Sequence, residues 1–136
     1  MKCSIYERRF RVNERPENYI RHVNNLSYLQ WFIDTAIEHA QTLGWGMQIS
    51  KERGLAWVAQ SHQIEYLSPA YQDDDILIRT WIEKVTPTRI TRRYECKRAE
   101  KVLAQARTVW VMVDYESGKA KALPKDIKET FERLLT

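Results

Sequence analysis

The chain has 136 residues and a mass of 16.3 kDa, which fits one domain over residues 1–136. Hydrophobic residues make up 43% and charged residues 29%, a balance that excludes an intrinsically disordered chain. The first ten residues, MKCSIYERRF, lack the apolar core of a signal peptide, and the sequence has no apolar run long enough for a membrane span, so we expect a cytoplasmic protein.

The net charge of +4 and the pI near 9.1 favour an anionic partner. Nucleic acid, a membrane surface and a phosphate-bearing small molecule all fit this charge. A solvated basic surface without a ligand explains it equally well. The two cysteines, Cys3 and Cys96, lack metal-ligand spacing, so we expect reduced thiols and no metal site.

The first predicted elements are a strand and a long helix. Residues 4–13 mix apolar and basic positions as a strand does, and the polar, proline-containing loop NERPEN follows. From Asn25 apolar residues recur at spacings of three and four, which predicts a helix that ends at Gly44. The face predicted to be buried consists of Leu26, Leu29, Ile33, Ala36, Ile37 and Ala40. His39 falls on the predicted polar side.

Four strands and a short helix are predicted in the rest of the chain. After the turn-rich segment 44–54, strand-like runs cover residues 55–67, 76–85, 90–98 and 102–115. Their short connections predict antiparallel neighbours. Residues 123–135, with Pro124 near the first turn, are predicted as a C-terminal helix. This order predicts an α+β fold in which a curved antiparallel sheet of about five strands wraps a long central helix.

A basic stretch covers residues 86–101. Side chains alternate along a strand, so Arg89 and Arg93 are predicted to share one face and Arg92 to lie on the other. Such residues suit the phosphates of a ligand, or they form a charged outer surface that deters edge pairing. A nucleic-acid-binding module is the competing class, but the basic residues are few and no recognised nucleic-acid motif is present.

Residues 22–32, HVNNLSYLQWF, are similar to the segment H-V-N-N-x-x-Y-L of hot-dog-fold acyl thioesterases of the 4-hydroxybenzoyl-CoA thioesterase-like superfamily. Residues 64–82 and 106–127 resemble further segments of that superfamily in the expected order. The resemblance implies a hot-dog fold and hydrolysis of an acyl-CoA or acyl-carrier-protein thioester to a free acid and a thiol. It also implies a homodimer or homotetramer, no cofactor beyond coenzyme A as part of the substrate, and neither nucleic acid nor membrane as a partner.

The resemblance places the catalytic residues at the start of the long helix. Backbone N–H groups near Asn24 and Asn25 would stabilise the negative charge that develops on the thioester oxygen. His22 would orient the carbonyl or a water molecule. Each asparagine is equally well explained as a helix cap.

Substrate-binding residues are expected in the helix and in the basic stretch. Tyr28 and Trp31 would line an acyl pocket, or they pack in the core or at a subunit interface. Arg89, Arg92 and Arg93 would bind the phosphates of coenzyme A. His62 is predicted to point inward from its strand as a core or interface histidine.

The sequence departs from the family where many relatives carry an aspartate, because that position is Asn18. An amide cannot take a proton from water near neutral pH. A glutamate of the same loop, Glu14 or Glu17, is one substitute, and Asp34 on the flank of the helix is another. In the third alternative no carboxylate is used, and Asn18 and His22 orient water. That alternative includes a catalytically weak or silent protein that only binds acyl thioesters.

Overall fold

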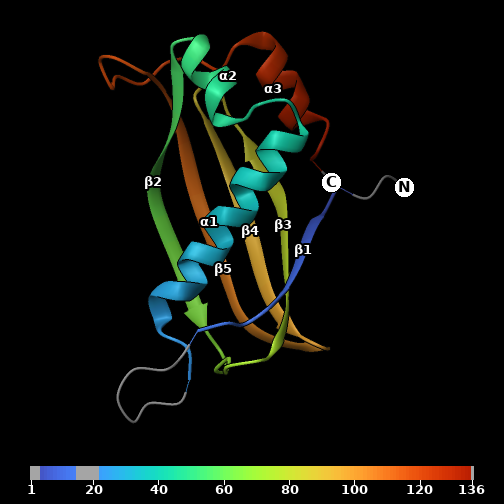
Figure 1. The fold of residues 1–136 in the computed structure, drawn as a ribbon. Coiled ribbons are helices and arrows are strands. Elements are labelled where there is room, and N and C mark those ends of the chain that lie inside the picture. The colour runs from blue at the N-terminus through green and yellow to red at the C-terminus, as the bar shows by residue number, and fades with distance from the viewer. Residues whose placement is uncertain (1–3, 15–21, 136) are drawn as a thin grey trace.

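The computed structural model describes residues 4–14 and 22–135 (Figure 1). In chain order the elements are β1 (Tyr6–Arg11), α1 (Asn25–Thr42), α2 (Met47–Glu52), β2 (Leu55–Tyr66), β3 (Asp75–Val85), β4 (Arg89–Arg98), β5 (Lys101–Asp114) and α3 (Lys125–Glu132). The sequence predicted all of these elements except α2, whose residues were assigned to turns. A helix of six residues is too short for a recurring apolar spacing to reveal it.

The five strands form one antiparallel sheet in the order β1-β3-β4-β5-β2. The hairpins β3–β4 and β4–β5 agree with the prediction that short connections join neighbours. The prediction is wrong for residues 67–74, because β2 pairs with β5 whereas β3 pairs with β1 and β4. This connection therefore crosses the end of the sheet, past the start of α1 (Figure 1).

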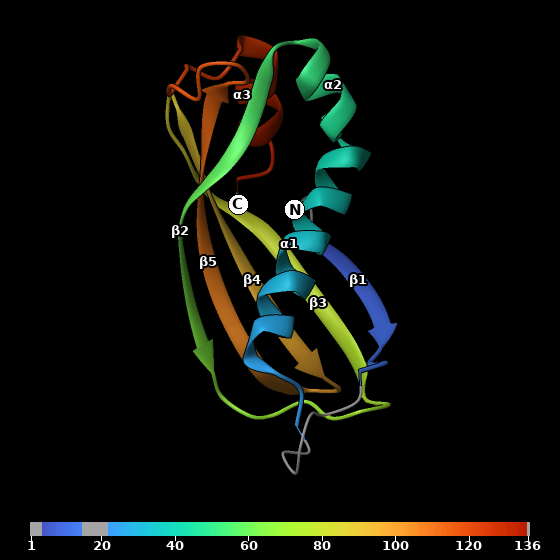
Figure 2. The same ribbon diagram turned by 60° about the vertical axis from the view of Figure 1, so that its left-hand side comes forward.

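The sheet curls around α1, as Figure 2 shows. The pairing register shifts between Ala59 and Ser61 in β2 and between Ile82 and Lys84 in β3. Such irregularities bend a strand and increase its twist. The result is a long helix wrapped by a curved antiparallel sheet, which is the expected hot-dog fold.

Helix α1 begins and ends close to the positions predicted from the sequence. The Asn24 side-chain oxygen accepts from the backbone N–H of Leu26 at 2.8 Å, which satisfies a donor that has no partner inside the helix. Gly44 lies just past the C-terminal end with φ of +83°, a conformation that favours glycine.

The face of α1 that packs on the sheet is not the predicted one. The buried residues are Tyr28, Phe32, Thr35, Ala36 and His39. Leu26 and Ile37, from the predicted face, are 74% and 40% exposed. At 3.6 residues per turn, the two faces differ by roughly a third of a turn.

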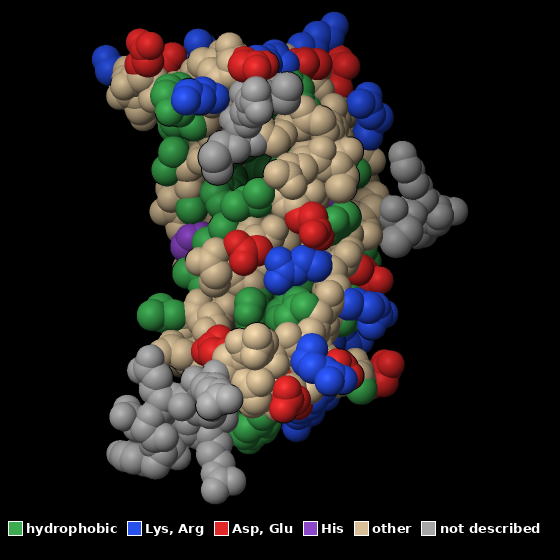
Figure 3. All heavy atoms as spheres, in the orientation of Figure 1, with side chains coloured by type: hydrophobic (Ala, Val, Ile, Leu, Met, Phe, Trp, Pro, Cys, Tyr) green, Lys and Arg blue, Asp and Glu red, His purple; other side chains and the backbone are tan. Residues whose placement is uncertain are grey.

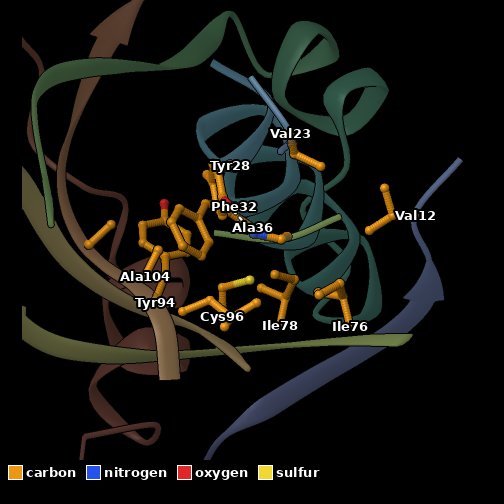
Figure 4. Packing of buried hydrophobic residues seen from close by; sticks show 13 residues of the cluster. Val12, Val23, Tyr28, Phe32, Ala36, Ile76, Ile78, Tyr94, Cys96 and Ala104 are labelled. Atoms are coloured by element: carbon orange, nitrogen blue, oxygen red, sulfur yellow. Dashed lines mark hydrogen bonds between the residues drawn. The ribbon is translucent and has the colours of Figure 1, made fainter. Parts of the chain in front are cut away.

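The core lies between α1 and the concave face of the sheet (Figure 4). Phe32 is fully buried, and its ring packs on that of Tyr94 with centroids 5.1 Å apart. Ile78 and Cys96, from β3 and β4, lie in the same cluster. Burying a side chain such as Phe32 stabilises the fold by about 1.5–3 kcal/mol. Among the helices of the described residues, none is long and apolar enough to cross a membrane.

Candidate active site

The segment that leads into α1 is held by the connection between β2 and β3. Val23 donates its backbone N–H to the carbonyl of Ala70 at 2.8 Å, and His22 forms a β-bridge with Tyr71. The backbone N–H of Ala70 in turn donates to the Tyr28 hydroxyl at 2.8 Å. The crossing connection thereby fixes the position of His22 relative to the helix.

His22 is exposed, and its ring can act on a ligand in solution. Its Nδ1 lies 3.3 Å from the carbonyl oxygen of Val23. A carbonyl oxygen can only accept, so in this contact Nδ1 carries the hydrogen. The Nε2 atom of the neutral ring is then an acceptor, which can take a proton from water.

The N-terminal end of α1 lies directly after His22. Asn24 is its cap, so the capping interpretation of this residue is confirmed. Asn25 is the first helical residue and is exposed, and its carbonyl accepts from the Tyr66 hydroxyl at 3.0 Å. The partial positive charge of a helix N-terminus is suited to an anion, including a developing oxyanion.

A carboxylate reaches this end of the helix from the loop after β1. The Ser27 hydroxyl, in the first turn of α1, donates to Glu14 Oε1 at 2.8 Å. The backbone N–H of Glu14 donates to Gln72 in the crossing connection at 2.7 Å. Glu14 is therefore positioned by two elements beside the helix N-terminus. Asn18 and Glu17 lie outside the described residues.

Asp34 does not lie at the N-terminal end of α1. It lies ten residues after Asn24, about 15 Å along the helix axis. Its Oδ1 accepts from the Gln30 side chain at 2.7 Å, one turn earlier on the helix. Within one chain, the structure brings Glu14 to the start of α1 and leaves Asp34 away from it.

Tyr28 and Trp31 are packing residues in this structure. Tyr28 is 2% exposed, and burial raises the pKa of its phenol. Trp31 is half-buried, and its ring packs against Phe10 and Tyr28 with centroids 5.1 Å away in each case. This placement agrees with the core-packing alternative for both residues.

The predicted alternation of the basic stretch is confirmed, because β4 buries every second residue and keeps Arg89 and Arg93 on the other face. On that face Arg93 pairs with Glu83 at 3.6 Å, and Arg89 donates to Gln60 at 3.0 Å. Arg92 is only 2% exposed. A buried guanidinium does not match the expectation of a phosphate ligand at a pocket mouth.

A sequence model of the thioesterase-like superfamily matches residues 13–131. The chain belongs to this superfamily. This superfamily member is 28% identical over 113 residues to "Acyl-CoA thioesterase YbgC" of Haemophilus influenzae, an alignment that covers 82% of this chain and 83% of that protein.

Solved structures share the fold of this superfamily member. A 1,4-dihydroxy-2-naphthoyl-CoA thioesterase from Synechocystis has a TM-score of 0.85 at 20% identity, with 96% of this chain and 97% of the other covered. A Staphylococcus aureus protein in complex with CoA has a TM-score of 0.90 at 11% identity, with 100% and 89% covered. At these identities the likeness concerns the fold.

The two remaining histidines of this thioesterase-like protein differ in how they agree with their predictions. His62 is exposed on the edge strand β2, but it lies on the predicted inner side of the sheet, because it pairs with the buried Thr108 and its Nδ1 lies 2.9 Å from the Thr108 hydroxyl. His39 was predicted on the polar side of α1, but it is 5% exposed. Burial and the nearby charge of Arg92 lower the pKa of His39 to about 4. The rotated face of α1 accounts for the burial of His39.

Proposed function

We propose that this chain hydrolyses the thioester bond of an acyl-CoA, with a free acid and a thiol as products. Superfamily membership and the similarity to a protein named as an acyl-CoA thioesterase support hydrolysis over silent binding. The observation that carries the proposal for the site is the exposed His22 directly before the capped N-terminus of α1.

In the proposed reaction, the oxygen of a water molecule attacks the carbonyl carbon and forms a C–O bond. The negative charge that develops on the carbonyl oxygen is stabilised by the N-terminal end of α1. Collapse of this intermediate breaks the C–S bond, and the departing sulfur receives the proton that the water lost. Besides the thioester, the reaction consumes only water, and we propose no cofactor.

We propose that Glu14 and His22 handle this proton. A carboxylate at the start of α1 supplies the base that the amide of Asn18 cannot supply. The Ser27 hydroxyl holds the Glu14 side chain in place at 2.8 Å. His22, with Nδ1 engaged by a carbonyl, presents Nε2 to water or to the departing sulfur.

We also propose that the chain works as a homo-oligomer. Strand β2 lies at an edge of the sheet and exposes Val58 and Tyr66, while Leu26 and Ile37 are exposed on α1. Exposed apolar groups of this kind on neighbouring elements are typical of an interface. Sedimentation velocity tests this, and a chain that stays monomeric at micromolar concentration would contradict it.

A cytoplasmic location remains part of the proposal. Cys96 is a free, buried thiol, and burial raises its pKa to about 12. A reduced thiol is typical of the compartment in which acyl-CoA is available.

The experiment is free-thiol release from a panel of short, long and aromatic acyl-CoAs. His22→Ala and Glu14→Gln should each lower kcat by roughly 10²–10⁴-fold, because each removes a group that moves a proton. Glutamine can still accept the hydrogen bond from Ser27, so Glu14→Gln tests the charge and not the fold. Asp34→Asn is the matched control and should stay within a few-fold of the native rate.

The outcomes separate the alternatives. Loss of turnover with Asp34→Asn but not with Glu14→Gln would assign the base to Asp34. Unchanged turnover in His22→Ala would remove the role of His22. Acyl-CoA binding without turnover in the native protein would replace hydrolysis by silent binding.

A further inference from the structure

A cavity of about 450 Å³ lies at the other end of α1. It is bounded by the C-terminal half of α1, by α2 and α3, and by strands β2, β4 and β5. Figure 3 shows a hollow with hydrophobic side chains on the face viewed in Figure 1. Cavities of this size commonly hold small ligands. Its helix residues Ala36 and Ala40 lie about 18–24 Å along α1 from Asn24.

The walls of the cavity are apolar and largely aromatic. Trp45, Trp57, Trp110, Tyr115 and Phe131 line it. The rings of Trp57 and Phe131 meet edge to face with centroids 5.7 Å apart. On the opposite side α1 contributes the aliphatic residues Ala36, Ile37 and Ala40. An apolar ligand suits this lining.

One lining residue, Arg92, is a buried cation, whereas Lys51, the other cation of the lining, is exposed. Its Nη1 donates to His39 Nδ1 at 2.9 Å and to the Thr80 hydroxyl at 3.2 Å. Its Nε–H has no partner among the described residues. No carboxylate of the described chain lies within 4.0 Å of this guanidinium, although Arg79, Arg93 and Arg98 all have one.

A buried cation without an anion is unfavourable unless a partner is supplied. His39 and Thr80 offer hydrogen-bond acceptors but no negative charge. Burial lowers the pKa of Arg92 to about 10, so the side chain is still a cation at neutral pH. The planar guanidinium group matches the two oxygens of a carboxylate.

We propose that this cavity binds an apolar ligand that carries a carboxylate, and that Arg92 holds the carboxylate. The aromatic walls take the apolar part, and the guanidinium of Arg92 takes the charged end. Two sources supply such a ligand. One is a free carboxylic acid, and the other is the far end of an acyl group whose thioester is at the opposite end of the helix. The second source rests on the proposed function, whereas the first does not.

Binding of octanoate and of octan-1-ol at pH 7.5, measured by calorimetry and by tryptophan fluorescence, tests the site. Three of the five tryptophans line the cavity, so occupancy should change the emission. Octanoate should bind at least about 10-fold more tightly than the alcohol, because a hydrogen bond to a charged group contributes this much. Equal affinity for the acid and the alcohol would overturn the proposal.

Two variants assign the preference to a residue. Arg92→Met replaces the guanidinium group by an apolar side chain of similar length. It should remove the preference for the acid while the alcohol still binds. Lys51→Met is the matched control, since Lys51 is an exposed cation that lines the same cavity, and it should keep the preference. Loss of the preference in Lys51→Met alone would overturn the assignment to Arg92. The acid-to-alcohol ratio of the native protein decides the proposal even where Arg92→Met does not fold.

The source is distinguished by hydrolysis of hexadecanoyl-CoA and hexadecanedioyl-CoA, which differ by a distal carboxylate and whose extended acyl chains are long enough to reach the cavity from the start of α1. A kcat/KM at least about 10-fold higher for hexadecanedioyl-CoA, lost in Arg92→Met, identifies the substrate's acyl group as the source. Octanoate binding without this kinetic preference identifies a free acid. Because octanoate binding is measured without any turnover, it stands or falls independently of thioester hydrolysis.

Discussion

The buried His39 makes the stability of this protein depend on pH. Its ring stacks on Tyr6 of β1 with centroids 4.7 Å apart, and its Nδ1 accepts from Arg92 of β4. Glu38, the neighbouring carboxylate, is engaged by the Tyr6 hydroxyl at 2.7 Å. Protonation of His39 would place a second cation beside Arg92 in the core. The folded state therefore keeps the imidazole neutral.

The size of the effect follows from the two pKa values. The pKa of His39 is about 4 in the folded protein, against 6.5 ordinarily. Above pH 6.5 the ring is neutral in both states and has no effect. As the pH falls below 6.5, the unfolded chain binds a proton that the folded chain does not, so stability is lost until the folded pKa is reached. Between pH 7 and pH 5 the free energy of unfolding should fall by about 2 kcal/mol from this residue.

Urea unfolding at a series of pH values between 7 and 5 measures this fall. His39→Gln removes the titration but leaves an acceptor for Arg92, so its free energy of unfolding should vary less with pH by about 2 kcal/mol. Parallel profiles for the native protein and His39→Gln would refute the reasoning.

Two further predictions concern the start of α1. Tyr28→Phe removes the hydroxyl that accepts from the buried Ala70 N–H, and urea unfolding should show a loss of about 1–3 kcal/mol, against about 0.5 kcal/mol or less for the exposed Tyr66→Phe. Equal losses would contradict the role of the buried acceptor. Asn24→Ala should lower the free energy of unfolding by about 1 kcal/mol and Asn24→Asp should not, because aspartate also caps a helix. A loss in Asn24→Asp as large as in Asn24→Ala would argue against capping.

The sequence predicted the strands and both ends of α1, its start near Asn25 and its end at Gly44. Alternating burial in β4 and the positive φ of Gly44 explain why, since each depends on local spacing alone. The path of residues 67–74 was not predictable in the same way. The sequence of a short connection contains no signal that its two flanking strands pair with other strands.

The prediction of the buried face of α1 was wrong for a different reason. The helix has two apolar stripes, and the sheet buries the one that carries Tyr28 and Phe32 rather than the one that carries Leu26 and Ile37. Periodicity gives equal weight to both, whereas packing selects the stripe whose aromatic rings fill the sheet. For the same reason His39 was predicted on the polar side of the helix although it is buried. The placement of Glu14 beside Ser27 likewise depends on tertiary structure, so Glu14 remained one of several alternatives.

The crossing connection also has a consequence for the order of folding. The hairpins β3–β4 and β4–β5 join residues that are close in sequence, whereas the bond between Ala70 and Tyr28 closes a separation of 42 residues. Contacts that close long loops form slowly because their entropic cost precedes their gain. We therefore expect the three-stranded meander to form early and the start of α1 to dock late. The end of the molecule that carries His22 would then be completed only when the remaining fold is already in place.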